Sequence, residues 1–209
     1  ELRCLAHFMA RWDKGAYAQV LLTGDVHSAN QAAAGLPTRD NAKTFVYAFL
    51  YGAGDAKIGS IIGKGAAAGK AIKAKFMRGL PALGFLSESV AKAAKKGFIK
   101  GLDGRPLYIR HAHAALNTLL QSAGALVCKR WGVELENILL AEGYKHGWDG
   151  DFALMATVHD EMQIACRTLE IAERVCAASK EAMKLAEAFY NFRCPLDTDS
   201  KIGANWASC

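Results

Sequence analysis

Zinc-type cysteine pairs and low-complexity linkers are both absent from this sequence of 209 residues. No two of its six cysteines stand at C-x-x-C spacing, which argues against a structural zinc site. A chain of this length buries enough apolar surface to do without disulfides. We therefore expect free, mostly buried thiols in a reducing compartment. The cysteines are Cys4, Cys128, Cys166, Cys176, Cys194 and Cys209.

Membrane and secretion signals are also absent. No apolar run approaches the ~20 residues that are needed to cross a bilayer. The opening residues Glu1-Leu2-Arg3 are typical of the middle of a protein rather than of a signal peptide or an initiation site. We expect no membrane partner and a cytoplasmic location, which is the host cytoplasm if a phage encodes the chain.

The overall charge is mildly basic. Lys and Arg number 26 against 20 Asp and Glu, a net charge of +6. This excess suits a polyanionic partner without identifying one. The length fits one large domain or two interleaved subdomains, and no repeat or clean domain boundary divides the chain.

Apolar periodicity and turn residues predict an α+β fold that is mostly helical. Two hairpins are expected, at residues 98–109 around the turn signal Asp103-Gly104 and at residues 152–166. The tail from Asn191 is expected to be irregular. Helices are expected at residues 2–10, 16–22, 26–34, from 38 to the stop at Gly52, in pieces over 58–80, and at 113–131, 134–141 and 169–189.

A segment rich in glycine and lysine, residues 63–71, superficially resembles a phosphate-binding P-loop. That motif needs four residues between its first glycine and Gly-Lys, but the gap here is three from Gly65 and five from Gly63. Ala71 also lacks the hydroxyl that would bind magnesium. We interpret the segment as the basic start of a helix.

The helix after Pro37-Thr38 carries a polar face. Proline favours a helix start and Thr38 can cap it. The polar side chains Arg39, Lys43, Tyr47 and Tyr51 are four residues apart and therefore share one face. Two cations at a helix start can bind a triphosphate, and a tyrosine one turn on can contact a base or sugar. The ordinary alternative is a solvated basic face with two half-buried tyrosines.

The second hairpin places His159-Asp160-Glu161 at its tip. A carboxylate on a rigid turn is exposed and available to a hard divalent metal, such as the ions that assist phosphoryl transfer. Such chemistry normally uses a second carboxylate from another strand. The ordinary alternative is a polar turn.

Together these patterns resemble family A DNA polymerases. The spacing Arg39-x3-Lys43-x3-Tyr47-x3-Tyr51-Gly52 is similar to the family's fingers-helix signature, and Val158-His159-Asp160-Glu161 to its second carboxylate motif. Within the family, several strings resemble the replicative polymerases of T-seven-like phages. These strings begin at Thr38, Phe49, Trp148 and Asn191, and they run nearly end to end in the family's order. The segment near residues 88–98 is shorter than in those relatives.

The resemblance implies roles around the nucleotide. Arg39 and Lys43 would bind the phosphates of the incoming nucleotide, with Lys43 also an acid for the pyrophosphate leaving group. Tyr47 would stack near the base and sugar. His27 would touch the phosphates, although a capping or core histidine is the ordinary reading of its position. Glu1 would end the first carboxylate motif and select deoxyribose.

The resemblance also implies contacts to metal and DNA. Asp160 would be one of two metal-holding aspartates, with Glu161 beside it, and His159 would contact the primer-terminal backbone. Tyr51 would lie near the templating base. Asn117 and Gln121 would test base-pair geometry in the minor groove, which offers acceptors at every pair; the alternative is an exposed polar stripe.

The implied activity is template-directed DNA synthesis from deoxynucleoside triphosphates, with two Mg²⁺ ions and primer-template DNA. A palm at residues 1–36 and 105–209, with an antiparallel sheet and helices, would hold a mostly helical fingers subdomain at residues 37–104. The first catalytic aspartate would lie five residues before Glu1. The thumb, through which phage relatives borrow a host processivity factor, and the exonuclease domain would lie outside this chain. We therefore expect residues 1–209 alone not to polymerise DNA.

Two alternatives stay open. One is a remnant that binds primer-template or nucleotide without chemistry, and the other is an unrelated basic nucleotide-binding enzyme.

Overall fold

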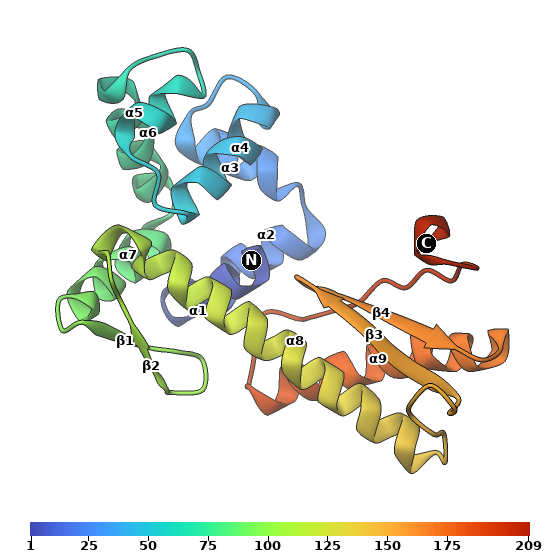
Figure 1. Cartoon of the computed structure of the whole chain (residues 1–209). Coiled ribbons are helices and arrows are strands. Elements are labelled where there is room, and N and C mark those ends of the chain that lie inside the picture. Colours follow the sequence, from blue (N-terminus) through green and yellow to red (C-terminus); the bar gives the residue numbers. More distant parts are fainter. The chain divides into compact units, whose positions relative to one another are not determined.

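The computed structural model describes all residues, Glu1–Cys209, and confirms the α+β class (Figure 1). The chain forms two compact units, Glu1–Ser122 and Ala123–Cys209. The predicted palm and fingers boundaries are a different division and stay a prediction.

Helices dominate the first unit. Most begin and end where local sequence dictates: Asp25 and Thr38 cap α3 and α4 through their side chains, and α1 ends at Lys14 in the left-handed conformation. The helices are α1 (Leu2–Asp13), α2 (Ala16–Thr23), α3 (Val26–Ala34), α4 (Arg39–Leu50), α5 (Asp55–Ser60), α6 (Ala66–Gly79), α7 (Pro81–Ala94) and the short η1 (Ala112–Ala114).

Aromatic packing holds α4 against α6. The Phe45 and Phe76 rings meet edge to face with centroids 5.0 Å apart, and Phe49 meets Phe76 at 5.5 Å. Phe45 and Phe76 are fully buried. Such edge-to-face pairs add roughly 0.5–1.5 kcal/mol to the burial of the rings. The apolar face of α4 is thereby fixed, and its polar face points away from this core.

The P-loop lookalike is a helix–helix contact. Helices α5 and α6 lie side by side (Figure 1). A Cβ on Gly69 would lie 1.9 Å from the Asp55 carbonyl oxygen, and one on Gly59 would lie 2.1 Å from that of Gly65. The glycines therefore serve close backbone packing, and the interpretation of this segment as a helix start is confirmed.

The first predicted hairpin is confirmed, with short strands β1 (Phe98–Lys100) and β2 (Pro106–Tyr108) paired antiparallel. Gly104 has a positive φ of 81° in the turn, a conformation that glycine adopts at little cost. Helix α7 packs against α1 and β1. The sequence did not predict this helix, since the helical pieces expected at residues 58–80 end before Pro81.

The expected break between residues 131 and 134 is wrong. One helix, α8 (Ala115–Ala141), runs through Gly132. Glycine inside a helix costs about 1 kcal/mol relative to alanine. Burial of Trp131, Leu135 and Leu139 outweighs this cost, and the Trp131 indole donates to the Ser179 carbonyl at 3.0 Å.

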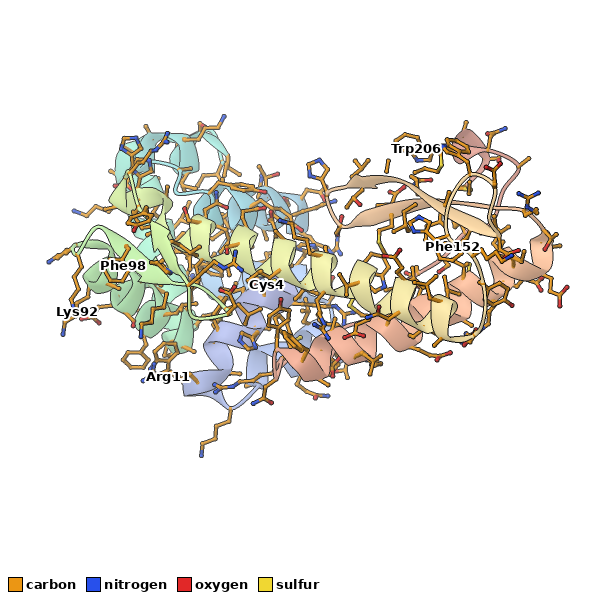
Figure 2. The ribbon with its side chains drawn as sticks, turned by 60° about the horizontal axis from the view of Figure 1, so that its bottom comes forward. Cys4, Arg11, Lys92, Phe98, Phe152 and Trp206 are labelled. Carbon is orange, nitrogen blue, oxygen red and sulfur yellow. The ribbon has the colours of Figure 1, made fainter.

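The second unit contains the rest of α8, a hairpin and α9 (Leu169–Phe189). Strands β3 (Phe152–Val158) and β4 (Glu161–Cys166) pair antiparallel, so the second predicted hairpin is confirmed. Phe152, labelled in Figure 2, is buried at the start of β3. The tail is irregular except for η2 (Trp206–Ser208), as expected.

None of the six cysteines forms a disulfide, and fewer are buried than the sequence suggested. Cys4 and Cys194 are buried, Cys209 is exposed and the other three are half-buried. No helix has the length and apolar character to span a membrane.

The glycine packing gives a stability prediction. Gly69→Ala should lower the free energy of unfolding by about 1–3 kcal/mol, because its methyl group would overlap the backbone of α5. Gly84→Ala is the matched control inside α7, where the nearest atom is 3.6 Å away. It should instead stabilise by about 0.5–1 kcal/mol, since alanine replaces glycine in a helix interior. Urea unfolding measures both; equal effects would show that the α5–α6 contact is not tight.

Candidate active site

The helix predicted after Pro37-Thr38 is α4. It carries Arg39, Lys43 and Tyr47, and Tyr51 follows its last residue. Thr38 caps the helix by accepting the Asn41 N–H at 3.1 Å. Lys43 is exposed and has no carboxylate partner, whereas Tyr47 is half-buried. A free ammonium one turn from a helix start, where the dipole is positive, gives this face the field that an anion requires.

Asp25 organises the start of this face. Its carboxylate accepts Arg39 Nε at 2.7 Å and Arg39 Nη2 at 3.2 Å, a bidentate pair. The same carboxylate caps α3, accepting the His27 N–H at 3.0 Å and the Ser28 hydroxyl at 2.7 Å. The N-terminal ends of α3 and α4 are therefore joined through one side chain. Sequence reasoning missed this role, although an aspartate directly before a helix is itself a capping signal.

The ion pair shifts the pKa of both Asp25 and Arg39. Hydrogen bonds from Arg39, then from Ser28, hold the pKa of Asp25 well below its ordinary value. The Asp25 carboxylate correspondingly raises the pKa of Arg39. Both groups are charged at neutral pH, so the guanidinium is held in a fixed direction before any ligand arrives.

His27 lies in the first turn of α3, within the region that Asp25 organises. It is half-buried, and its Nδ1 is shielded from solvent without a hydrogen-bond partner. A shielded polar atom without a partner costs about 1–3 kcal/mol. The structure thus brings His27 and Arg39 together through Asp25, while the predicted phosphate contact of His27 stays a prediction.

A second cluster joins three predicted site residues, Glu1, Tyr51 and Gln121. The Tyr51 hydroxyl donates to Glu1 Oε1 at 2.5 Å, and Gln121 Nε2 donates to the same oxygen. Gln121 Nε2 also approaches the Tyr51 hydroxyl at 3.4 Å. The hydrogen bond to Glu1 raises the pKa of Tyr51. Asn117 lies one turn earlier on α8, half-buried and outside this cluster.

The turn between β3 and β4 places Asp160. Val158 pairs with Glu161, so only His159 and Asp160 form the turn. His159 has a positive φ of 56°. That conformation is uncommon for residues other than glycine, and such strain of order 1–3 kcal/mol is characteristic of functional sites. A two-residue turn on paired strands holds Asp160 in one place.

The carboxylates at this turn suit a hard cation. Asp160 is exposed and makes no hydrogen bond within the chain, while Glu161 accepts from Gln163. Burial, and next the charge of Asp160, raises the pKa of the Cys128 thiol on α8. No group of three or more His, Cys, Asp or Glu side chains forms a closed metal site. Mg²⁺ binds through one or two carboxylates together with substrate phosphates, and Asp160 with Glu161 fits that partial set.

The family model of DNA polymerase family A matches residues 1–208, and the chain belongs to this family. It is 56% identical over 224 aligned residues to the DNA-directed DNA polymerases of Enterobacteria phage T3 and Escherichia phage T7. These alignments cover 100% of this chain and 32% of each relative, so the chain spans about a third of the proteins it matches. The polymerase of Escherichia phage Phieco32 is 39% identical over 204 residues, covering 91% of this chain and 31% of the relative.

The fold comparison agrees with the sequence comparison. The structure is similar to the POL domain of Pol1 from M. smegmatis, which was solved in complex with DNA primer-template and dNTP. The TM-score is 0.77 at 19% identity, over 94% of this chain and 36% of that one. The resemblance to family A and the right-hand polymerase fold expected from it are therefore confirmed.

The Asp25 pair predicts a pH-dependent stability. Because the folded-state pKa of Asp25 is depressed, the stability that its charge contributes is full above the ordinary aspartate value of 3.8 and disappears as the pH falls through the folded-state pKa. Asp25→Asn should therefore unfold at lower urea than the parent at neutral pH, and the gap should shrink below pH 3.8.

Asp199→Asn, a loss of the same charge from the exposed tail, is the control and should leave the urea midpoint unchanged. A gap between parent and Asp25→Asn that stays constant with pH would mean that the charge of Asp25 does not stabilise the fold.

Proposed function

We propose that this chain acts in template-directed DNA synthesis, as the nucleotide-binding and part of the catalytic region of a DNA-directed DNA polymerase. The primer 3′-hydroxyl attacks the α-phosphate of a deoxynucleoside triphosphate; one P–O bond forms as another breaks, and pyrophosphate leaves. The observation that carries this proposal is the Asp25–Arg39 ion pair beside an unpaired Lys43, which is a cationic face prepared for a triphosphate.

The first unit supplies the groups for the nucleotide. Arg39 and Lys43 bind the phosphates, and His27 contacts them from the start of α3. An arriving triphosphate competes with Asp25 for the guanidinium, which is already aimed and loses little freedom on binding. Tyr47 stacks near the base and sugar.

The cluster of Glu1, Tyr51 and Gln121 supports selection of the nucleotide. The carboxylate of Glu1 accepts from two donors and is therefore held in one position. A carboxylate fixed beside the sugar of the incoming nucleotide would crowd a ribose 2′-hydroxyl and so favour deoxyribose. Tyr51 lies by the templating base, and Gln121 with Asn117 contacts the minor groove of primer-template DNA. His159 contacts the primer-terminal backbone.

The second unit supplies metal-binding oxygens. Asp160, with Glu161 beside it, would hold Mg²⁺. When bound, two such ions lower the pKa of the attacking hydroxyl and neutralise charge on the leaving pyrophosphate. The protein's own part is to hold the carboxylates at a rigid turn.

The wider setting is also a proposal. Two phage relatives carry the name DNA-directed DNA polymerase, which supports a role in phage DNA replication in the host cytoplasm. A host processivity factor acting through a thumb stays a prediction.

The direct test is primer extension with Mg²⁺ by the full-length protein that carries this sequence. Asp160→Asn should lower the rate by about 10³-fold or more, because an amide cannot replace a metal-holding carboxylate. Asp199→Asn, which removes an exposed carboxylate from the tail of the same unit, should leave the rate unchanged.

Extension that survives Asp160→Asn would contradict the proposed catalytic role. Binding of primer-template and nucleotide without any extension by the parent would instead favour the alternative of a non-catalytic binding protein.

The assignment of Lys43 gives a second test. Lys43→Ala should slow single-turnover phosphoryl transfer by about 10²–10⁴-fold, the contribution typical of a general acid. Lys92→Ala is the matched control, since Lys92 is an exposed lysine in the last turn of α7 (Figure 2). An unchanged transfer rate with only a weaker apparent nucleotide affinity would show that Lys43 binds phosphate without assisting the leaving group.

A further inference from the structure

The 145–152 loop, from Lys145 to Phe152, is built to hold the outer edge of β3. The Asp151 N–H donates to the Lys145 carbonyl and the Lys145 N–H to Asp151 Oδ2, each at 2.7 Å. The Gly147 N–H donates to the Phe152 carbonyl at 2.9 Å. Gly147 has a φ of 121°, and a Cβ on Gly150 would lie 2.2 Å from the Lys145 carbonyl oxygen. The loop is thus closed by its own backbone and requires its glycines.

His146 connects this loop to α8 and β3. Its Nδ1 lies 2.7 Å from Glu136 Oε1, and its Nε2 accepts the Leu154 N–H at 3.3 Å. Because Nε2 accepts, the neutral imidazole carries its proton on Nδ1 and donates it to Glu136. The ring stacks on Phe152 with centroids 5.0 Å apart and planes inclined by 7°. Both nitrogens and one ring face are therefore engaged.

The bond to Leu154 falls beside an irregularity in β3. Leu154 pairs with Ile164 and Ala156 with Gln163, so Met155 has no partner and forms a β-bulge. A bulge bends its strand and redirects the side chains beyond it, and bulges are common next to active sites. Ala156, Thr157 and Val158 lead from this bulge straight into the turn that carries Asp160.

We propose that His146 is a positioning residue: held by Glu136, it fixes the bulge of β3 and thereby the direction of the Asp160 carboxylate. The inference rests on the proposed role of Asp160 as a metal ligand. The Leu154 N–H faces the outer edge of β3, and without the imidazole it would have no partner there. The strand would then be free to shift its register, and a one-residue slip reverses every side chain after it.

The first measurement needs no metal. In the full-length protein without Mg²⁺, exchange of the Leu154 amide hydrogen should be slow in the parent and fast in His146→Ala. His146→Gln keeps an acceptor near the Nε2 position and should retain much of the protection. Glu136→Gln keeps an acceptor for Nδ1 and should have a smaller effect, and Glu173→Gln on the exposed face of α9 should have none.

The second measurement separates positioning from simple stabilisation. His146→Ala should lower the single-turnover rate about 10- to 100-fold and raise the Mg²⁺ concentration for half-maximal rate, as loss of a group supporting a metal ligand does. Primer-template affinity without Mg²⁺ and the nucleotide KM should stay close to the parent values. The single-turnover rate and the Mg²⁺ dependence of His146→Gln should lie between those of the parent and those of His146→Ala.

The results discriminate clearly. A Leu154 amide that stays protected in His146→Ala would overturn the proposal, as would full exposure of that amide with an unchanged rate and Mg²⁺ dependence. Equal losses of primer-template affinity, nucleotide affinity and rate would also overturn it, since they indicate general destabilisation. If His146→Ala does not fold, His146→Gln and Glu136→Gln carry the same comparisons. Full activity of Asp160→Asn would refute the proposed function, and the exchange measurement would still decide whether His146 holds the bulge.

Discussion

The ion pair between Asp25 and Arg39 is the contact on which the polar face of α4 depends. A single carboxylate caps α3 and fixes the guanidinium at the start of α4, so two helix N-terminal ends are oriented by one group. Behind it, the Phe45 and Phe76 rings hold α4 on α6 and leave its polar residues outward. An exposed ion pair alone adds only a small amount to stability, and here the Asp25 carboxylate also accepts from His27 and Ser28. Its value here is geometric, because it holds the Arg39 guanidinium in a fixed direction at the start of α4.

The second unit also holds a side chain in place before any ligand binds, but it does so through a backbone turn instead of an ion pair. Asp160 is held by a two-residue turn in which His159 adopts a strained backbone conformation. That strain is tolerated because the flanking strands are paired, and because the 145–152 loop covers the edge of β3 through backbone bonds and His146. Groups that are rigid before a ligand binds lose less entropy when it does. Preorganisation is thus built into each unit separately.

Local signals were sufficient for much of the fold. Pro37 and Thr38 predicted the start of α4, and Asp103-Gly104 the first hairpin. The helix break predicted near Gly132 is wrong, because burial of its neighbours outweighs the propensity cost of a single glycine in α8. The family resemblance implied separate roles for Glu1, Tyr51 and Gln121, but it did not predict that they meet, across 50 and 120 residues of sequence. Contacts of this kind depend on tertiary packing, which periodicity does not describe.

The most direct measurement is hydrogen exchange of the full-length protein with primer-template and a nucleotide triphosphate, using a dideoxy-terminated primer so that the complex persists. With the triphosphate that matches the template base, in the presence of Mg²⁺, amides at the start of α4 and in the turn around Asp160 should become protected. A mismatched triphosphate should protect them far less. Protection that ignores the template base, or that spares both segments, would contradict the account that these two sites serve templated nucleotide addition.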